Sequence, residues 1–406
     1  MIGDGWDGEP SVRPGPEAAD TGAPAERRRV AVVTGSRAEF GLLRPVMRAV
    51  TARPDLELLV IAAGSHLVSP ALTLRDVQAE FHVFDSVPMQ IAGKVGRAED
   101  AESVGRGVGR FARAFERASP GWVVVLGDRV EAFAAAAAAS IGGHALAHVH
   151  GGDRAEGVAD EAMRHAISKL AHLHLAATAQ SRDRLVRMGE EPARVHTVGS
   201  PAIDGLGAAP ELPDDRFASL GSPALVVLLH PVGRSPEHEE AAAAEVLAGA
   251  LKSAGDAGVL ALAPNLDPGR DGVVRALSRA AERERRLKLI DHLPRAEFVG
   301  LLKRVARARG ALVGNSSAAL IEAGALRLPA VDAGPRQRGR ERPANVVHVD
   351  HERADEIARA IDHARALDLA AMTHPYGDGH AGERIAEIFS RTNPRAPGFL
   401  RKICAY

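Results

Sequence analysis

The sequence predicts an α/β protein with two Rossmann-like domains that face a central cleft. Short apolar runs rich in β-branched residues alternate with longer segments of helical period, and this alternation occurs twice along the chain. Strands that are apolar throughout, with helices between them, are typical of a parallel sheet covered on both faces. Between the two arrays, residues 199–222 are dense in Gly, Pro, Asp and Ala, which favours a hinge between domains.

Each array supplies its expected elements in chain order. In the first array the expected strands are 30–33, 58–61, 123–126 and 145–149, and the expected helices include 42–50, 104–118 and 131–140. In the second array the expected strands are 225–229, 259–263, 287–290, 311–313 and 330–331, and the expected helices include 239–254 and 296–306. The domain organisation that we expect is a disordered tail (1–28), an N-terminal domain (29–200), a linker (201–222), a nucleotide-binding C-terminal domain (223–375) and a helix (380–392) that packs back on the first domain.

The composition excludes several classes of protein. The 406 residues include 51 Lys and Arg against 52 Asp and Glu, a net charge of −1, so the basic field of a dedicated nucleic-acid-binding protein is missing. The single cysteine, Cys404, can form neither an intrachain disulfide nor a thiolate metal site. Apolar stretches fall short of the roughly 20 residues that span a bilayer, and residues 1–26 lack the pattern of a secretory signal. We expect a cytoplasmic protein without nucleic-acid or membrane partners.

Polar residues that follow the strands are the candidates for a site, because open α/β sheets bind ligands at the carboxyl ends of their strands. After the first strand, a glycine turn leads through Arg37 into a helix whose N-terminus favours an anion. A tight turn with a solvated arginine is the equal alternative. Asp128 and Arg129 follow strand 123–126 and fit a catalytic carboxylate beside a phosphate-binding arginine, or equally a helix N-cap with a surface arginine.

A denser group of titratable residues follows strand 145–149. The strand ends in a His-Val-His-Gly-Gly-Asp run from His148 to Asp153, and the next helix carries Asp160 and Arg164 on one face. Histidines and carboxylates this close to a Gly-Gly turn favour an acid/base site. A metal site is the weaker interpretation, because the spacing matches no zinc motif.

The second array carries candidates for anion binding. His230 follows strand 225–229, while Ser316 and Ser317 begin a helix as either an N-cap or a diphosphate site. Three arginines in loop 334–340 fit a phosphate, with a solvated basic loop as the alternative. Two Rossmann-like domains with an anion site on each side of the cleft describe a sugar-nucleotide enzyme of the glycosyltransferase-B (GT-B) type.

Several short motifs occur in a familiar order along the chain. They are Gly35-Ser36-Arg37-Ala38-Glu39-Phe40-Gly41-Leu42, Gly64-Ser65-His66-Leu67, Gly127-Asp128-Arg129, His148-Val149-His150-Gly151-Gly152-Asp153, Arg164-His165-Ala166-Ile167-Ser168-Lys169-Leu170, Gly314-Asn315-Ser316-Ser317, Arg336-Gln337-Arg338-Gly339-Arg340 and Pro375-Tyr376-Gly377-Asp378-Gly379. Together they resemble the UDP-N-acetylglucosamine 2-epimerase family, and specifically its hydrolysing branch, from about Arg29 to Phe389. The non-hydrolysing branch looks different, with Thr in place of Arg129 and Asp-Ser-Gly-Gly in place of Asn315-Ser316-Ser317.

The resemblance implies roles for individual residues. The acid/base groups of the family map onto Asp128, His150 and Asp160, and other members carry Glu at the position of His150. His230 joins the catalytic set by holding the phosphates as they depart, and Glu322 would hold the ribose hydroxyls. The residues implied to contact the UDP-sugar are Arg37, Glu39, His66, Arg129, Arg164, Asn265, Ser316, Ser317, Glu322, Arg336 and Gln337. The resemblance implies no cofactor and no metal.

The implied reaction is elimination followed by hydration. A base removes the proton on sugar carbon 2 while UDP leaves carbon 1, and water then adds to the unsaturated glycal, giving UDP and N-acetylmannosamine for sialic-acid synthesis. The nearest alternative is the same chemistry on a UDP-2,4-diacetamido-2,4,6-trideoxyhexose of the legionaminic-acid pathway. More distant alternatives are a non-hydrolysing epimerase, a GT-B glycosyltransferase and a non-catalytic nucleotide-sugar sensor. The resemblance also implies a homo-oligomer, either a dimer or a tetramer.

Overall fold

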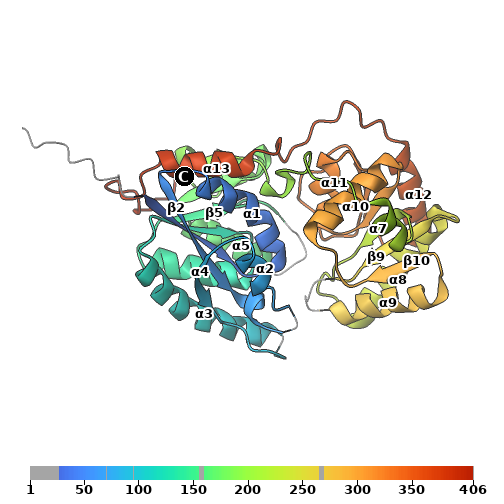
Figure 1. The fold of residues 1–406 in the computed structure, drawn as a ribbon, viewed down its shortest axis with the longest axis horizontal. Helices are drawn as coiled ribbons and strands as arrows, with labels where there is room; N and C mark the ends of the chain where they lie inside the picture. Colours follow the sequence, from blue (N-terminus) through green and yellow to red (C-terminus); the bar gives the residue numbers. More distant parts are fainter. Residues whose placement is uncertain (1–26, 70, 95, 155–159, 265–268, 406) are drawn as a thin grey trace, which may run out of the picture.

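The chain forms two parallel β-sheets, each covered by helices. The computed structural model describes residues 27–405 apart from 70, 95, 155–159 and 265–268. Figure 1 shows the sheets in two lobes, with the blue-to-green first array in one lobe and the yellow-to-orange second array in the other. The predicted fold class, an α/β protein with two Rossmann-like domains, is confirmed.

The first sheet has the strand order β3-β2-β1-β4-β5-β6-β7, with every neighbouring pair parallel. The chain therefore builds outward from β1 in both directions, which is the doubly wound Rossmann topology. The strands are β1 (Arg28–Thr34), β2 (Leu56–Ala63), β3 (Val83–Val87), β4 (Trp122–Leu126), β5 (Leu146–Val149), β6 (Leu173–Ala176) and β7 (Val195–Thr197).

Helices cover both faces of the first sheet. They are α1 (Arg37–Thr51), α2 (Leu74–Gln78), α3 (Arg97–Ala118), α4 (Val130–Ile141), α5 (Asp160–Leu170) and α6 (Ala179–Arg187), with short 3-10 turns η1 (Gly64–Leu67) and η2 (Pro192–Arg194). From the far end of the chain, α13 (Ala381–Arg391) packs against α1. Phe389 of α13 is fully buried, with its ring centroid 5.5 Å from that of Trp122. The apolar face of α13 thus joins the C-terminal part of the chain to the first sheet.

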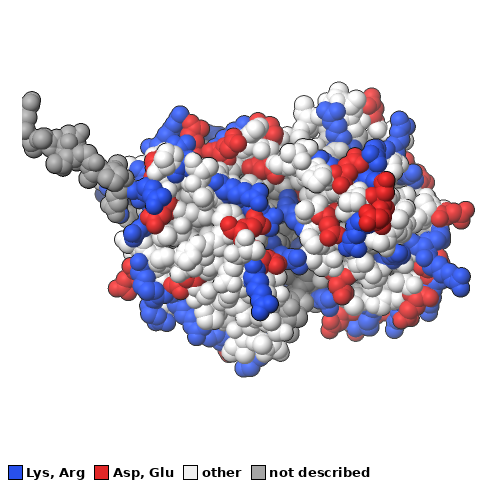
Figure 2. All heavy atoms as spheres, in the orientation of Figure 1, with Lys and Arg blue, Asp and Glu red and all other residues white. Residues whose placement is uncertain are grey.

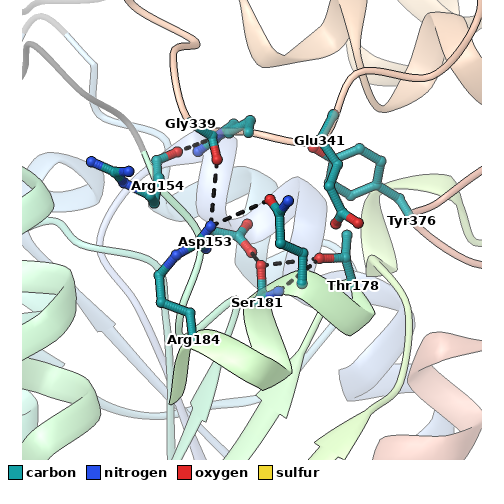
Figure 3. Close-up of a pocket in the computed structure, with 10 residues that line it drawn as sticks. Asp153, Arg154, Thr178, Ser181, Arg184, Gly339, Glu341 and Tyr376 are labelled. Carbon is teal, nitrogen blue, oxygen red and sulfur yellow. Dashed lines mark hydrogen bonds between the residues drawn. The ribbon is translucent and has the colours of Figure 1, made fainter. Parts of the chain in front are cut away.

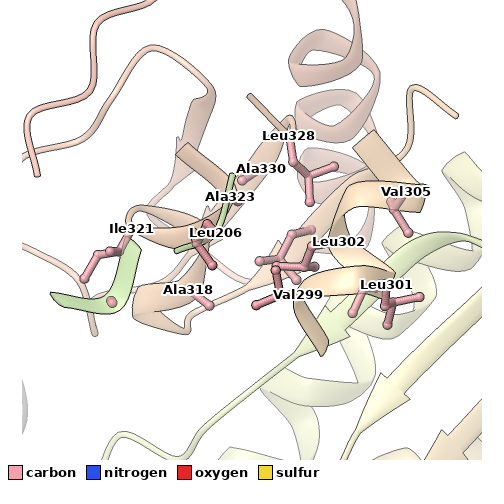
Figure 4. Close-up of a cluster of buried hydrophobic side chains, with 14 of the residues drawn as sticks. Leu206, Val299, Leu301, Leu302, Val305, Ala318, Ile321, Ala323, Leu328 and Ala330 are labelled. Atoms are coloured by element: carbon pink, nitrogen blue, oxygen red, sulfur yellow. The ribbon is translucent and has the colours of Figure 1, made fainter. Parts of the chain in front are cut away.

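The second sheet repeats the pattern with the order β10-β9-β8-β11-β12-β13. Its strands are β8 (Pro223–Leu228), β9 (Gly258–Leu262), β10 (Leu287–Ile290), β11 (Ala311–Gly314), β12 (Ala330–Ala333) and β13 (Val346–Val349). Its helical elements are η3 (Pro201–Ile203), α7 (Asp214–Ser219), α8 (Pro236–Ala254), α9 (Arg270–Arg283), α10 (Arg295–Arg307), η4 (Ser317–Ala319), α11 (Glu322–Ala325) and α12 (Ala354–Ala366). On one face, side chains of α10 such as Leu302 and Val305 pack with Leu328 and Ala330, as Figure 4 shows. On the other face, α8, α9 and α12 form a second apolar layer.

The chain departs from the predicted elements at the sheet edges and at β6, the strand next to one edge. Strands β3, β6, β7 and β13 were not predicted: β3 alternates between more and less exposed residues, and β6 and β7 are interrupted by His174 and His196. β1 begins at Arg28, inside the expected tail, where the Arg28 guanidinium donates to the carbonyls of Ser390 at 2.8 Å and Thr392 at 3.0 Å at the C-terminal end of α13. Residues 1–26 of that tail lie outside the described residues. The expected linker contains η3 and α7.

The two passages of the chain between the lobes lie side by side. Ser200, in the outgoing passage, donates its backbone N–H to the carbonyl of Tyr376, in the returning passage, at 2.7 Å. Gly199 has a φ of +89°, and a Cβ there would lie 3.1 Å from the same carbonyl, so the close approach requires glycine. Among the described residues, no helix has the length and apolar character needed to cross a membrane.

Candidate functional site

The turn after β1 is held by the cap of α1. Ser36 is the N-cap residue and accepts the Glu39 N–H at 3.3 Å, while Glu39 Oε2 accepts the Gly35 N–H at 2.9 Å. This is a variant of the capping box, in which a serine and a glutamate three residues later satisfy free backbone donors. Glu39, predicted to contact the UDP-sugar, thus shapes the turn. Arg37 begins the helix half-exposed, with its Nε 3.7 Å from Asp76 Oδ2.

Glu39 shares its buried surroundings with Glu131. The Glu131 side chain is fully buried and occupies the space where a Cβ on Gly35 or Gly64 would lie, within 2.5 Å of its atoms. Burial, and then the charge of Glu131, raise the pKa of Glu39 to about 8. Glu39 is therefore mostly protonated at neutral pH.

This raised pKa predicts a pH-dependent effect of Glu39→Gln. Folded Glu39 keeps its proton up to about pH 8, whereas the unfolded chain releases it near pH 4.5, so this residue lowers stability as the pH rises between those values. The glutamine variant has no such titration. Its free energy of unfolding relative to wild type should rise from pH 5 to pH 8, as measured by urea unfolding of both proteins across that range. Parallel pH profiles of the two proteins would contradict the prediction.

Arg164 of α5 joins the ends of β4 and β5. Its Nη2 pairs with Asp128 Oδ2, and its Nη1 donates to the carbonyl of His150 at 3.2 Å. The arginine side chain is 5% exposed and the Asp128 side chain is 17% exposed, so the pair is largely desolvated while the carboxylate still reaches the surface. A carboxylate held in this way at the carboxyl edge of the sheet is placed to accept a proton from a ligand. Asp160 is the first residue of α5, and its side chain is outside the described part of the chain.

His150 forms a second buried cluster on the turn after β5. Its Nδ1 lies 2.8 Å from Asp153 Oδ2 and its Nε2 lies 2.9 Å from Ser200 Oγ, with the backbone at a φ of +62°. Burial favours the protonated form of Asp153, but His150, Arg340 and Arg164 outweigh it and hold the pKa of Asp153 below its usual range. The order Ser-His-Asp is that of a nucleophilic triad. However, Ser200 is fully buried, so the contact links His150 to the interdomain passage and leaves no accessible nucleophile.

In the second lobe, Asn315 gathers the residues that follow β8, β11 and β12. Its side-chain amide accepts the backbone N–H of His230 and donates to the His230 carbonyl, both at 2.8 Å. Its own carbonyl accepts Gln337 Nε2 at 2.8 Å and Arg336 Nη1 at 3.4 Å. Burial, and then the charge of Arg336, lower the pKa of His230 to about 3, so its ring is neutral at neutral pH. Asn315, which was not in the predicted set, thus holds together three residues that were: His230, Arg336 and Gln337.

The remaining predicted residues of the second lobe lie at nearby helix starts. Ser316 is the N-cap of η4 and accepts a backbone N–H at 3.3 Å, and Ser317 is the first residue of that turn. Glu322 begins α11 with its Oε1 3.1 Å from Arg295 Nη1. The same arginine donates to the carbonyl of Ala202 in the interdomain passage. Glu322, expected to hold ribose hydroxyls, is therefore already part of an ion pair.

Arginines from both lobes meet around a small pocket beside Asp153. Figure 2 shows Lys and Arg side chains gathered where the lobes meet. Arg340 Nε donates to the carbonyl of Arg154 at 2.6 Å, and Arg184 Nη2 lies 3.5 Å from the carbonyl of Gly339. The pocket, drawn in Figure 3, is lined by Asp153, Arg154, Thr178, Gln180, Ser181, Arg184, Gly339, Arg340, Glu341 and Tyr376. The loop after β12 therefore connects the phosphate candidates of the second lobe to the acid/base candidates of the first.

Some predicted residues are not brought into this arrangement. His66 is fully buried, with its Nε2 3.0 Å from Thr34 Oγ1 and its Nδ1 2.7 Å from Thr73 Oγ1, and burial lowers its pKa to about 4. The ring ties β1 to Thr73, beyond the turn after β2, and the substrate contact predicted for His66 stays a prediction. Arg129 is half-exposed with its Nε 3.4 Å from Glu131 Oε2. Asn265 lies outside the described residues.

Three residues of the site were absent from the predicted set. Asp153 closes the His-Gly-Gly-Asp run and Asn315 precedes Ser316, so their positions at strand ends were a usable signal. Ser200 gave no such signal, because it meets His150 across 50 residues of sequence. In the part of the chain that the structure describes, no three His, Cys, Asp or Glu side chains gather as a metal site would require.

The fold and the paired clusters at the carboxyl edges of two Rossmann-like sheets define a GT-B-type α/β protein. The family model for UDP-N-acetylglucosamine 2-epimerase matches residues 48–390. The chain belongs to this family.

Individual relatives agree with that assignment. The chain is 32% identical to the UDP-N,N'-diacetylbacillosamine 2-epimerase (hydrolyzing) of Legionella pneumophila, over 93% of this chain and 100% of that protein. It is 30% identical to a UDP-N-acetylglucosamine 2-epimerase of Neisseria meningitidis, over 89% of this chain and 95% of that protein. Its fold matches the Methanocaldococcus jannaschii UDP-GlcNAc 2-epimerase solved with UDP-GlcNAc and UDP, with a TM-score of 0.75, 18% identity and coverage of 90% and 100%.

Proposed function

We propose that the protein is a hydrolysing UDP-sugar 2-epimerase that releases UDP and the free 2-epimeric sugar. The observation that carries the proposal is the ion pair of Asp128 and Arg164, which holds a partly exposed carboxylate at the carboxyl edge of the first sheet. Across the interdomain contact, Arg336 and His230 are gathered on Asn315. A base in one lobe and a cationic group in the other are the two requirements of eliminating UDP from a sugar.

In the proposed reaction, a carboxylate of the first lobe removes the weakly acidic proton on sugar carbon 2. The bond from carbon 1 to the UDP oxygen breaks, and its electrons leave with the diphosphate, whose charge Arg336 stabilises. Water then adds to carbon 1 of the glycal, and a proton returns to the opposite face of carbon 2. We assign the acid/base work to Asp128 and Asp160 with His150. The neutral His230 would donate a hydrogen bond to the diphosphate.

The binding contacts proposed for the UDP-sugar are likewise divided between the two lobes. The nucleotide side comprises Asn265, Ser316, Ser317, Glu322, Arg336 and Gln337, and the side of the first lobe comprises Arg37, Arg129 and Arg164. Glu322 would have to exchange its Arg295 partner, or share it, to reach a ribose hydroxyl. A cytoplasmic location and assembly into a homo-oligomer are part of the same proposal.

Two substrates fit the proposal. The first is UDP-N-acetylglucosamine, which would give N-acetylmannosamine for sialic-acid synthesis. The second is a UDP-2,4-diacetamido-2,4,6-trideoxyhexose, and the 32% identity to a hydrolysing UDP-N,N'-diacetylbacillosamine 2-epimerase over that protein's full length favours it.

The test is proton and phosphorus NMR of the purified protein with each UDP-sugar in deuterated water. We expect free UDP together with the 2-epimeric sugar carrying deuterium at carbon 2, because the proton is removed to solvent and replaced from it. A UDP-linked epimer without free UDP would place the protein in the non-hydrolysing branch. Transfer of the sugar to an acceptor with retention of the carbon 2 proton would identify a glycosyltransferase, and binding without turnover would identify a sensor.

A further inference from the structure

The segment after α13, residues 399–405, lies against the first lobe, where Figure 1 marks the C-terminal end beside α13. The Phe399 ring packs edge-on to Trp122 at 5.5 Å, and the Arg194 guanidinium covers that ring at 4.6 Å while donating to the Phe399 carbonyl at 2.6 Å. Farther on, the Ala405 N–H donates to the Gly189 carbonyl at 2.9 Å. The segment is thus held at both ends, and Lys402 lies between these anchors.

Lys402 binds the C-terminal end of α5. Its Nζ donates to the carbonyls of Ser168 at 2.8 Å and Ala171 at 2.5 Å, and lies 2.7 Å from Glu190 Oε2. The last carbonyls of a helix lack partners within the helix and carry partial negative charge, so an ammonium there is favourable. Glu190 is 2% exposed and also binds Lys169 of the same helix, at 2.8 Å. Two lysines and one buried carboxylate therefore fix where α5 ends.

A chain of hydrogen bonds leads from this end of α5 to the loop of Asp128. The Ser168 side chain lies 3.0 Å from His148 Nδ1, and His148 Nε2 lies 2.8 Å from the carbonyl of Gly127, the residue before Asp128. A carbonyl only accepts, so Nε2 carries the proton of the neutral ring, and the Ser168 hydroxyl must donate to Nδ1. Burial lowers the pKa of His148 to about 3, which keeps the ring neutral. Each of these two hydrogen bonds therefore has a fixed donor and a fixed acceptor.

We propose that Lys402 is a positioning residue for the reaction. Through Ser168 and His148 it sets the place of the Gly127–Asp128 loop, and through α5 it sets the place of Arg164, the partner of Asp128. Segment 399–405 thereby becomes a distant part of the acid/base site, although it touches no substrate. This inference rests on the proposed function for its catalytic consequence, while its structural consequence is independent of it.

The test compares Lys402→Met with a matched control, Lys303→Met. Lys303 also donates to two backbone carbonyls, those of Gly207 and Ala209, but in the second lobe, so its loss removes two similar carbonyl contacts without touching the hydrogen-bond chain. The ion pair with Glu190 is removed only in Lys402→Met. We expect Lys402→Met to lower kcat about tenfold, since a displacement below 1 Å at a reacting group costs up to about 100-fold, with the Kd for UDP unchanged within about twofold. Lys303→Met should keep both values.

Ser168→Ala is the second variant, because it breaks the chain at a buried hydroxyl and leaves Lys402 in place. It should reproduce the fall in kcat. Hydrogen–deuterium exchange supplies a readout that needs no turnover: the peptide containing Gly127, whose N–H donates to the Val149 carbonyl at 3.0 Å, should exchange faster in both variants and not in Lys303→Met.

The outcomes separate the two proposals. If wild type turns over no UDP-sugar, the proposed function fails, and the exchange rates alone still decide the positioning role. Wild-type kcat and wild-type exchange in Lys402→Met would overturn that role. Equal losses of kcat, UDP affinity and thermal stability in Lys402→Met and Lys303→Met would overturn it as well, because they would indicate only general destabilisation.

Discussion

Asp128→Asn is expected to abolish turnover almost completely while the protein still binds UDP. The asparagine cannot accept a proton from sugar carbon 2, and the loss of a general base typically lowers the rate by about 10²–10⁴-fold. The change also leaves Arg164, which is 5% exposed, without its carboxylate. A fall in stability is therefore expected beside the loss of rate. Stopped assays of UDP release measure turnover, and calorimetric titration with UDP measures UDP binding. Thermal unfolding of the variant and of wild type measures the change in stability.

Asp85→Asn is the control for this prediction. Asp85 in β3 is 19% exposed, close to the 17% of Asp128, and it also pairs with an arginine, Arg117. It lies in the outermost strand of the first sheet, away from the carboxyl-edge cluster of β4 and β5. Asp85→Asn should keep wild-type turnover. Turnover by Asp128→Asn within a few-fold of wild type would remove Asp128 from the catalytic set and leave the acid/base work to other groups.

The sequence predicted the fold, which the structure confirms, and the place of the candidate site for the same local reason. In a buried parallel sheet the strands are apolar runs, so the first polar residues after each run mark the carboxyl edge. Asp128, His150, His230 and Asn315 all lie at such ends. The same logic failed at β3 and β7, because an edge strand has an exposed side and shows no apolar run.

The partners within the site could not be predicted, since they join residues far apart in the chain. Asp128 meets Arg164 across 36 residues and Asn315 meets His230 across 85. Local pattern also fails to separate two similar turns that end in buried histidines. His66 and His150 both follow a strand in a turn that contains glycine, yet His66 is enclosed by two threonines. His150 instead contacts Asp153 and Ser200, so only the packing partners distinguish the two histidines.

Arg336→Met is expected to weaken UDP binding about 10- to 100-fold. The Arg336 guanidinium reaches Asn315, the residue that also fixes His230, and its charge is felt at the His230 ring. A hydrogen bond between charged groups contributes about 1.5–3 kcal/mol, which corresponds to that change in Kd. Turnover should fall further than binding, because negative charge grows on the diphosphate as it leaves. Titration with UDP and steady-state kinetics measure the two effects.

Arg338→Met tests whether this effect belongs to one arginine or to the charge of the whole loop. Arg338 is two residues away, 46% exposed, and pairs with Asp350 at 2.9 Å on the surface. A surface pair of this kind is worth little, so Arg338→Met should bind UDP within about twofold of wild type. Similar losses in both variants would mean that the loop attracts the nucleotide by its summed charge. UDP binding would then weaken with added salt. A loss confined to Arg336→Met would instead assign the diphosphate to one guanidinium, which the contact with Asn315 holds in place.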